Sequence, residues 1–371
     1  MDFTNTQTLI HLRSYAKELR PLLPAEAFER DPSKLVILLI NLAILILGWL
    51  IAAKLNLWPT YLLWLYLPLA VVMGNSVIVL AFSSHELFHG SVIKHSRLTH
   101  TIGLLGLTML WMPPTLWKAV HNRVHHNQTN DLGDPDRSFF YEQPKSWVTL
   151  THDLFVPSAG INPVGLTVGM PLAWLTYAFR NLTAVLLFNR EFVDYVPASF
   201  KVKAKERRAI AGEFLIILTI HLSLWAYLQF DPLKLTFGYF IPLGIGYAGF
   251  MFYIYTNHML CRLTSVNDPL INSVSLRVPQ LFDQLHLNFS YHTEHHIFPG
   301  MNSDYYPLVQ ELLKTHYPER FNLLDAGEAW RLLRETPRYY KDENTLTDRS
   351  GENLIPCPLN HRVLVVGERK A

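Results

Sequence analysis

Residues 55–89 read LNLWPTYLLWLYLPLAVVMGNSVIVLAFSSHELFH, a long apolar run that leads into two histidines. From Leu55 to Ser84 it carries no charge. At about 1.5 Å per helical residue it is long enough to cross the roughly 30 Å hydrocarbon core of a bilayer. The residues that follow supply His85 and His89, which an α-helix places on one face, about one turn apart. The stretch therefore predicts a membrane helix that ends in a pair of metal-binding imidazoles.

Three further uncharged stretches complete the membrane pattern, namely Leu35–Ala53, Phe214–Phe230 and Leu235–Cys261. Asn56 to Thr60 supply a turn between the first two stretches, and Asp231-Pro232 supplies one between the last two. We therefore predict an all-α integral membrane protein with four transmembrane helices in two hairpins. The expected spans are 35–54, 60–84, 211–230 and 235–258.

Two other apolar segments are interrupted by prolines. Thr101–Trp117 is broken by Pro113-Pro114, and Leu154–Phe179 contains Pro157, Pro163 and Pro171. Proline breaks the regular hydrogen bonding that a membrane helix requires. We expect both segments to be interfacial or re-entrant rather than spanning.

Composition excludes several classes of protein. Only 17% of the 371 residues are charged, against about 25% in soluble domains. The 32 Lys and Arg nearly balance the 30 Asp and Glu, so the chain lacks the basic surplus of a nucleic-acid binder. Two cysteines, Cys261 and Cys357, are too few for a disulfide scaffold, an all-thiolate zinc site or a protein-borne iron–sulfur cluster. The 17 histidines, by contrast, call for a chemical explanation.

Basic residues predict the orientation of the spans. Five of them stand just before the third span, namely Lys201, Lys203, Lys205, Arg207 and Arg208. Because positively charged segments remain on the cytoplasmic side, we expect this segment and both termini there. The expected parts are an N-terminal cytosolic or interfacial segment (1–30), a membrane domain (31–320) and a C-terminal cytosolic tail (321–371).

Nine histidines gather at the ends of these stretches. They form HELFH at 85–89, HNRVHH at 121–126 and HTEHH at 292–296, and His258 closes the fourth span. With the predicted spans, all nine lie on one membrane face: His85, His89, His121, His125, His126, His258, His292, His295 and His296. In each motif the first histidine and a later one share a helix face. Adjacent histidines diverge by about 100° and can serve two different metals.

The number of imidazoles indicates the kind of metal. Nine neutral imidazoles exceed the needs of one tetrahedral zinc and fit two metals of higher coordination number. Iron is favoured where open positions must bind oxygen.

Two local patterns point elsewhere. HELFH also matches a zinc protease motif, in which two histidines bind zinc and the glutamate is the general base. An intramembrane protease needs an acidic third ligand, however, and Asn162-Pro163-Val164-Gly165 has valine where that ligand should be. Gly244 to Gly249 reads GIGYAG, a dinucleotide-binding pattern, but it lies within a membrane span. There we interpret it as a helix-packing surface of small residues.

The three motifs resemble those of the membrane fatty acid desaturase and hydroxylase superfamily, and most closely those of acyl-lipid desaturases. The resemblance covers about residues 30–320 and includes the strings at 127–130, 134–136 and 297–300 (NQTN, DPD and IFPG). It implies that the eight motif histidines ligate a di-iron centre and that His258 matches an extra histidine after the last span. It also implies an asparagine that contacts iron through water, for which Asn257 and Asn288 are candidates. The implied fold adds a cytosolic helical cap.

Carboxylates near the motifs are candidates for orienting the imidazoles through their second ring nitrogen. They are Glu86, Asp134, Asp136, Glu294 and Asp283. For Asp134 and Asp136 a solvated turn is an equal alternative. Five histidines outside the motifs, including His286, are expected at the surface or at helix ends. His221, within the third span, is expected to form an interhelical hydrogen bond.

We therefore expect an oxygen-dependent di-iron desaturase that introduces a double bond into a long acyl chain. Removing hydrogen from a methylene requires an oxidant that side chains do not supply, so two iron ions and O2 are implied. Electrons must come from an external carrier of the ferredoxin or cytochrome b5 type. The alternatives are a carotenoid or sphingolipid ketolase, hydroxylase or desaturase, and, more distantly, the zinc protease or a non-catalytic metal-handling membrane protein.

Overall fold

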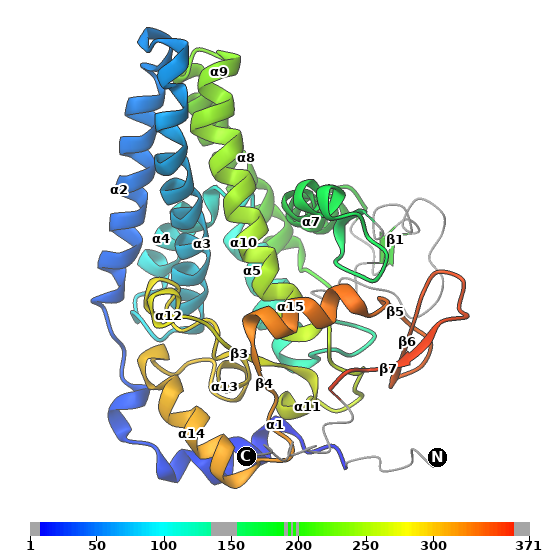
Figure 1. Ribbon diagram of the computed structural model, residues 1–371. Coiled ribbons are helices and arrows are strands. Elements are labelled where there is room, and N and C mark those ends of the chain that lie inside the picture. Colours follow the sequence, from blue (N-terminus) through cyan, green and yellow to red (C-terminus); the bar gives the residue numbers. More distant parts are fainter. Residues whose placement is uncertain (1–7, 135–153, 189–191, 194–195, 198–199, 360–371) are drawn as a thin grey trace, which may run out of the picture.

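The computed structural model describes residues 8–134, 154–188, 192–193, 196–197 and 200–359 (Figure 1). This part of the chain is mostly helical, as predicted. It contains four helical segments long and apolar enough to cross a membrane: Lys34–Leu57, Thr60–His89, Ala204–Tyr227 and Pro232–His258. Each overlaps one predicted span. The third begins and ends earlier than the predicted 211–230, because helix formation continues back through the basic segment.

The first two long helices are α2 (Lys34–Ala52) and α3 (Leu67–His89). Short 3₁₀ turns at Leu55–Leu57 and Thr60–Tyr66 join them, around the predicted break at Pro59. α3 continues past the apolar stretch and stops at Gly90, whose φ of 85° is left-handed. Glycine adopts this conformation without a Cβ clash and commonly terminates helices. The first histidine motif is therefore the last turn of α3.

The other two long helices are α8 (Ala204–Tyr227) and α10 (Ile241–His258). Between them lie α9 (Pro232–Leu235) and a π turn at Thr236–Phe240. The Asp231 carboxylate accepts the backbone N–H groups of Leu233 and Lys234, which caps α9. The predicted Asp231-Pro232 turn is confirmed.

α3 and α10 pack at glycines. A Cβ built on Gly246 would lie 2.7 Å from Val77 Cβ, and one built on Gly74 would lie 2.6 Å from Ile245 Cγ2. These distances are too short for a larger side chain without movement, so glycine permits the close approach. The interpretation of GIGYAG as a packing surface is confirmed. This contact holds together the two helices whose ends carry His85, His89 and His258.

The proline-interrupted segments form α4 (Ser96–Thr108), α5 (Pro114–Trp117) and α7 (Pro163–Thr183). None of them is among the four helices suited to crossing a membrane. In Figure 1, α7 is seen nearly end-on, whereas α2, α3 and α8 are seen from the side. The strands β1 (Phe192–Val193) and β2 (Val196–Pro197) pair antiparallel after α7.

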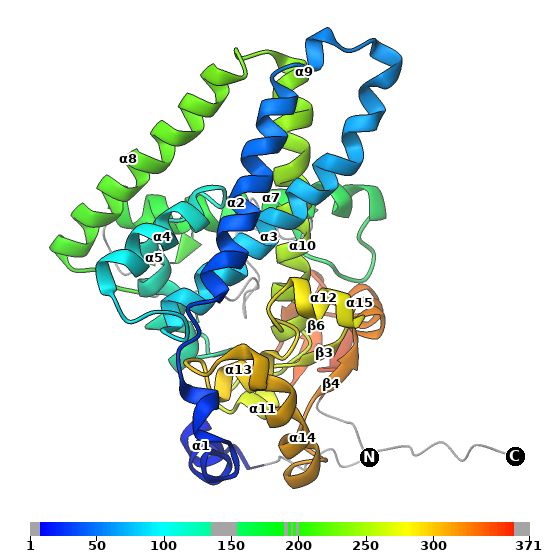
Figure 2. The same ribbon diagram turned by 90° about the vertical axis from the view of Figure 1, so that its left-hand side faces the viewer.

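The remaining elements gather around one end of the long helices (Figures 1 and 2). We call residues 8–33 and 262–359 the lower region. Its helices are α1 (Leu12–Leu19), α11 (Pro269–Asn272), α12 (Gln280–Leu285), α13 (His292–Ile297), α14 (Tyr306–His316) and α15 (Ala326–Glu335). Its strands are β3 (Ser275–Arg277), β4 (Leu323–Asp325), β5 (Tyr339–Tyr340), β6 (Thr345–Thr347) and β7 (Leu354–Pro356). β3 pairs parallel with β4, and β5, β6 and β7 form an antiparallel sheet.

A separate apolar core fixes α13 in the lower region. Tyr15 and Leu19 of α1 are buried against residues of α13 and α14, including Ile297, Val309 and Leu313. Asp268 is also fully buried, and it accepts hydrogen bonds from the Tyr15 hydroxyl and the Arg320 guanidinium. The N-terminal segment thus helps to hold the third histidine motif in place.

Candidate metal centre

Segments far apart in the sequence bring the nine predicted histidines together. His85 and His89 come from the end of α3, and His258 is the last residue of α10. The second motif runs through a π turn at Lys118–Asn122 and a 3₁₀ turn at His125–Asn127, and the third motif lies on α13. All nine side chains converge where these elements meet.

The imidazoles form two groups. The first cluster contains His85, His89, His121, His126 and His295, and the second cluster contains His125, His258, His292 and His296. Within each cluster, one ring nitrogen from every histidine lies within 4.8 Å of all the others. His125 and His126 fall into different clusters, as do His295 and His296. The prediction that adjacent histidines can face different metals agrees with this division.

The spacing of the nitrogens suits a metal ion. In the first cluster, His126 Nε2 lies 3.1 Å from His121 Nε2 and 3.2 Å from His295 Nε2. In the second, His292 Nε2 lies 2.7 Å from His258 Nε2 and 3.1 Å from His296 Nε2. Ligands about 2.1 Å from a metal lie about 3.0 Å apart along an octahedral edge and about 3.4 Å apart along a tetrahedral edge. The observed values are nearer to the octahedral spacing.

The second motif departs from a regular α-helix, with a π turn that ends at Asn122 and a 3₁₀ turn that begins at His125. A regular α-helix would place His121 and His125 on one face, yet His121 joins the first cluster with His126, five residues later. A π turn has about one residue more per turn than an α-helix, and such turns are frequent at functional sites. The sequence indicated that a later histidine shares the face of His121, and the local geometry decides which one.

Hydrogen bonds to the other ring nitrogen orient several imidazoles. His258 Nδ1 donates to the backbone oxygen of Asn272 at 3.0 Å, so in the neutral ring Nε2 carries the lone pair. His295 Nδ1 lies 3.0 Å from the Tyr306 hydroxyl. Such partners fix the tautomer and direct the free lone pair toward a metal. Tyr306 was missed at the sequence level, because nothing in its neighbourhood on the chain distinguishes it from the adjacent Tyr305.

Burial keeps these imidazoles neutral. It lowers the pKa of His121, His126, His292, His295 and His296 well below the usual value, and the neighbouring imidazoles lower it further. A neutral imidazole is the form that binds metal. The donor set therefore fits two metal ions, since it offers nitrogen lone pairs in two separate groups.

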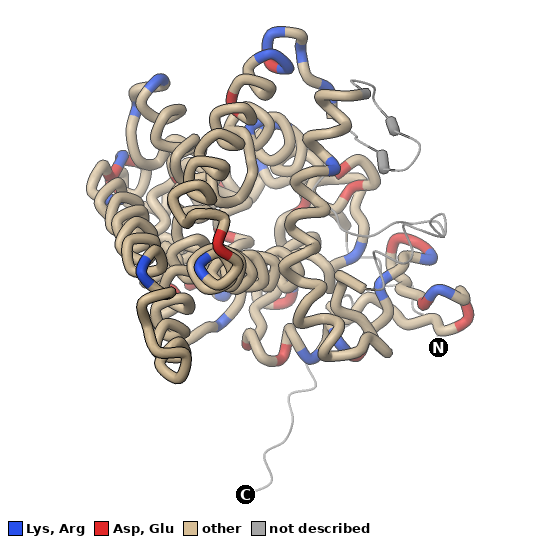
Figure 3. The backbone as a smooth tube through the Cα atoms, turned by 90° about the horizontal axis from the view of Figure 1, so that it is seen from above, with Lys and Arg blue, Asp and Glu red and all other residues tan. Residues whose placement is uncertain are grey.

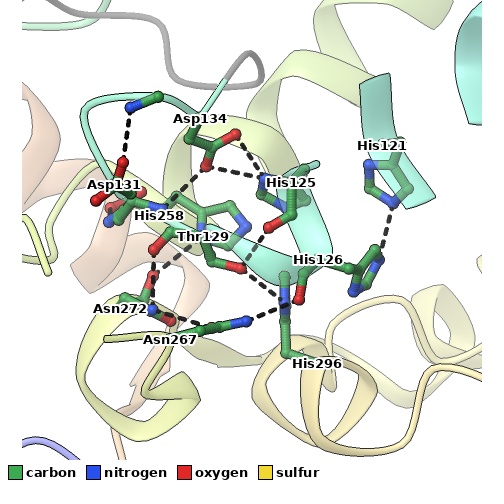
Figure 4. A network of polar contacts seen from close by, with 12 residues as sticks. His121, His125, His126, Thr129, Asp131, Asp134, His258, Asn267, Asn272 and His296 are labelled. Carbon is green, nitrogen blue, oxygen red and sulfur yellow. Dashed lines mark hydrogen bonds and ion pairs between the residues drawn. The ribbon is translucent and has the colours of Figure 1, made fainter. Parts of the chain in front are cut away.

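Asp134 and Thr129 support the second cluster (Figure 4). Both carboxylate oxygens of Asp134 lie 3.0 Å from His125 Nδ1. The buried Thr129 hydroxyl donates to the backbone oxygen of His125 at 2.8 Å and lies 3.3 Å from His296 Nδ1. For Asp134, the expected role of orienting an imidazole thus agrees with the geometry. The sequence assigned no role to Thr129, which stands there only as part of the NQTN string.

Two amides join this network to neighbouring segments (Figure 4). Asn272 Nδ2 donates to the backbone oxygen of Thr129 at 3.0 Å, and Asn267 Nδ2 donates to that of His126 at 2.7 Å. Both amides come from the stretch between α10 and β3. They tie the second histidine motif to the segment whose backbone also holds His258.

The other predicted carboxylates differ among themselves. Glu86 Oε1 lies 3.7 Å from His85 Nδ1, while Glu86 Oε2 accepts from the Ser91 hydroxyl. Glu294 accepts hydrogen bonds from Ser275 and Gln310, so its two oxygens join β3 to α14. Asp283 likewise accepts from Ser290. Asp136 lies outside the described residues.

The two candidate asparagines also differ. Asn257 is fully buried beside His258, and its amide has no hydrogen-bond partner among the described residues. Asn288 instead donates to the backbone oxygen of Ser303 at 3.0 Å and takes a left-handed φ of 57°. Of the two asparagines, Asn257 is therefore the one whose side-chain amide is available to a water molecule or a metal ligand.

Two histidines outside the motifs have structural partners. His221 Nε2 donates to the Thr108 backbone oxygen, and its Nδ1 lies 2.8 Å from the Tyr239 hydroxyl, which confirms the interhelical bond. His286 ends α12 but is buried rather than at the surface. Its nitrogens lie 2.9 Å from the Tyr253 hydroxyl and 3.0 Å from Asn75 Oδ1. It therefore links α12 to both α3 and α10.

Residues 162–165, where an intramembrane protease would carry its acidic zinc ligand, begin a helix instead. Asn162 Oδ1 accepts from the backbone N–H groups of Val164 and Gly165 and so caps α7. The Val164 side chain is 75% exposed. The position of the acidic third ligand is thus an exposed valine, and His85 and His89 instead have three further imidazoles beside them.

Comparison with known proteins agrees with this arrangement. The family model for fatty acid desaturases matches residues 59–325, which include all nine histidines of the two clusters. The chain belongs to the fatty acid desaturase family. As a member it is an oxidoreductase of the membrane-bound kind, consistent with the four apolar helices.

Two curated relatives are similar over different lengths. The chain is 24% identical over 303 residues to the sn-1 acyl-lipid omega-3 desaturase (ferredoxin) of Synechocystis sp., which covers 77% of this chain and 76% of that protein. It is 26% identical over 192 residues to the protein of the same name from Nostoc sp.. That match covers 51% of this chain and only about half, 48%, of the Nostoc protein.

Proposed function

We propose that this protein is an oxygen-dependent di-iron desaturase that introduces a double bond into a long acyl chain of a membrane lipid. The observation that carries the proposal is the division of nine imidazoles, seven of them buried, into two clusters of five and four. Family membership supports the desaturase chemistry. The similarity to two acyl-lipid desaturases supports an acyl-lipid substrate.

In this proposal the two clusters hold one iron each. The five histidines of the first cluster and the four of the second would be the ligands, and Asn257 would contact the second iron through a water molecule. Bound iron supplies the power to activate O2, which amino-acid side chains lack. The four-histidine cluster and its neighbour Asn257 leave room for a non-protein ligand. Asp134, Thr129 and Tyr306 keep the imidazole lone pairs aimed inward.

Aromatic side chains pack beside the ligands and make this side of the site apolar. Phe82 and Phe289 stack with ring centroids 3.8 Å apart, and the Phe289 ring lies 5.2 Å from that of His85. The Trp117 ring lies 4.6 Å from that of His121. These rings exclude water from the ligands and hold apolar substrate beside them.

The overall reaction requires an electron source outside the substrate. Two adjacent methylenes lose one hydrogen each, and O2 accepts those two electrons and two protons together with two further electrons and two further protons, giving two water molecules. The two further electrons come from an external carrier. The relatives' names support a ferredoxin, and a cytochrome b5 type is the alternative.

The proposal includes a membrane arrangement. α2 with α3 and α8 with α10 form two transmembrane hairpins, and the lower region is a cytosolic cap beneath them. The membrane domain covers about residues 31–320, between a cytosolic or interfacial N-terminal segment and a cytosolic C-terminal tail. Figure 3 supports it, since the long helices are mainly uncharged and charged positions lie mostly around them. The basic residues before α8 favour placing the histidine motifs and both termini in the cytoplasm.

Lipid analysis tests the function. Expression in a host without endogenous desaturases is expected to add a double bond to its long acyl chains. New carotenoid or sphingolipid products with unchanged acyl chains would instead assign the protein to another branch of the superfamily. Metal analysis of purified protein should give about two irons per chain, and a single zinc would overturn the proposal.

A further inference from the structure

A pocket opens beside the second histidine motif, outside the two clusters. Its volume is about 540 Å³, and it lies between that motif and the segment leading into α8. The residues that line it are Arg123, Val124, Asn127, Gln128, Phe200, Lys201, Val202 and Lys203. None of these lining residues is acidic, and three are cationic.

The surroundings of the pocket add positive charge. Lys205 and Arg208 follow on the first turns of α8 and are exposed, like Lys201 and Lys203. Glu206 pairs with Arg123 at 3.0 Å, so it neutralises one of these cations. Arg123 also donates to the backbone oxygen of Lys201 at 2.9 Å and thereby joins the two walls. The surface remains cationic overall.

The same pocket is close to both clusters along the chain. Val124 lines the pocket, and the next two residues along the chain are His125 of the second cluster and His126 of the first. Consecutive residues are only about 3.8 Å apart between Cα atoms. A redox group held over this wall is thus separated from ligands of both clusters by one or two residues of protein.

We propose that this pocket is the docking site of the external electron donor, an acidic one-electron carrier protein of the ferredoxin class. The inference rests on the proposed function, because the external donor is needed for the reaction proposed above. At each docking the reduced carrier gives up one electron and leaves oxidised, so two dockings support one double bond.

The charge of the surface fits such a partner. Electron-transfer complexes are small and short-lived, typically burying less than about 1,200 Å², and they form through complementary charge rather than large apolar patches. A cationic surface attracts an acidic carrier over several ångströms and speeds encounter.

Charge reversal tests the docking site. Full-length enzyme in nanodiscs is compared with Lys201→Glu/Lys203→Glu and with the neutral pair Lys201→Gln/Lys203→Gln. The probe is a reduced plant-type ferredoxin of net negative charge. We expect the KM for ferredoxin to rise about tenfold or more on reversal and by less on neutralisation, with kcat within about twofold. The wild-type KM should also rise with salt.

A second measurement separates docking from chemistry. Enzyme reduced chemically with dithionite and then given O2 needs no carrier, so its single-turnover yield should be the same in wild type and variants. Lys314→Glu/Arg331→Glu reverses two exposed charges on α14 and α15 and should leave the ferredoxin KM unchanged.

Each other outcome has a distinct meaning. An unchanged ferredoxin KM in the reversed variant would overturn the docking site. A lower single-turnover yield that recovers at higher lipid concentration would show that the pocket binds a lipid headgroup, which also overturns it. If the wild type itself forms no double bond in a single turnover, the proposed function fails.

Discussion

The Asp134 carboxylate faces His125 Nδ1 with both oxygens 3.0 Å away, and it also accepts the backbone N–H of Asn130 at 2.9 Å. One buried carboxylate thus orients a histidine of the second cluster and closes the loop that carries it. Both functions depend on a group nine residues from His125 along the chain.

Replacing Asp134 should therefore weaken one metal site selectively. Asp134→Asn is expected to lower metal affinity of the second cluster about 10- to 100-fold, because the amide is a weaker acceptor for the imidazole N–H. Metal titration of the apoprotein measures this. Asp131→Asn in the same loop is the control, since its retained Oδ1 can still accept from Gly133. Equal affinities in both variants would contradict the role of Asp134.

Neighbouring histidines should act on different metals. His125→Ala is expected to reduce the iron of the second cluster and His126→Ala that of the first, each abolishing activity while membrane insertion persists. His296→Ala should resemble His125→Ala and add little to it in the double variant, because both serve one site. Iron per chain and product formation measure these effects. Retained activity in any single variant would contradict the ligand assignment.

The hydrogen bonds of the Thr129 hydroxyl should contribute more to stability than the packing of the side chain. Thr129→Val preserves the shape but leaves the His296 Nδ1 atom facing a methyl group, a loss of about 1–3 kcal/mol in unfolding free energy. Thr129→Ser keeps the hydroxyl and should be nearly neutral. Thermal unfolding together with metal binding to the second cluster compares them. A serine variant as impaired as the valine variant would point to packing instead.

The contact between α3 and α10 should tolerate no added methyl at Gly246. Gly246→Ala places a Cβ 2.7 Å from Val77 Cβ, so we expect destabilisation of about 1–3 kcal/mol and reduced activity as the helix ends shift. Gly244→Ala, two residues earlier on the same helix, is a matched control, because its Cβ would have its nearest neighbouring atom 4.0 Å away. Unfolding in detergent measures both. Similar stability of the two variants would contradict the close approach.

Much of the fold and site could be predicted because the signals are local. Uncharged runs such as Leu55–Ser84 identify membrane helices directly, and the spacing of His85 and His89 fixes their common face. Glu294 shows the limit of this reasoning. Its position within HTEHH suggested an imidazole partner, but the fold around α13 turns it toward Ser275 and Gln310.

Residue type and short periodic spacing were enough to predict the four apolar helices and the nine candidate histidines. The folded chain decides how these histidines divide between two clusters. It also selected Asp134, Thr129 and Tyr306 as their partners and placed the basic pocket against the second motif. The physical reason is that these contacts depend on a local π turn and on the packing of segments more than a hundred residues apart, such as Thr129 against His296.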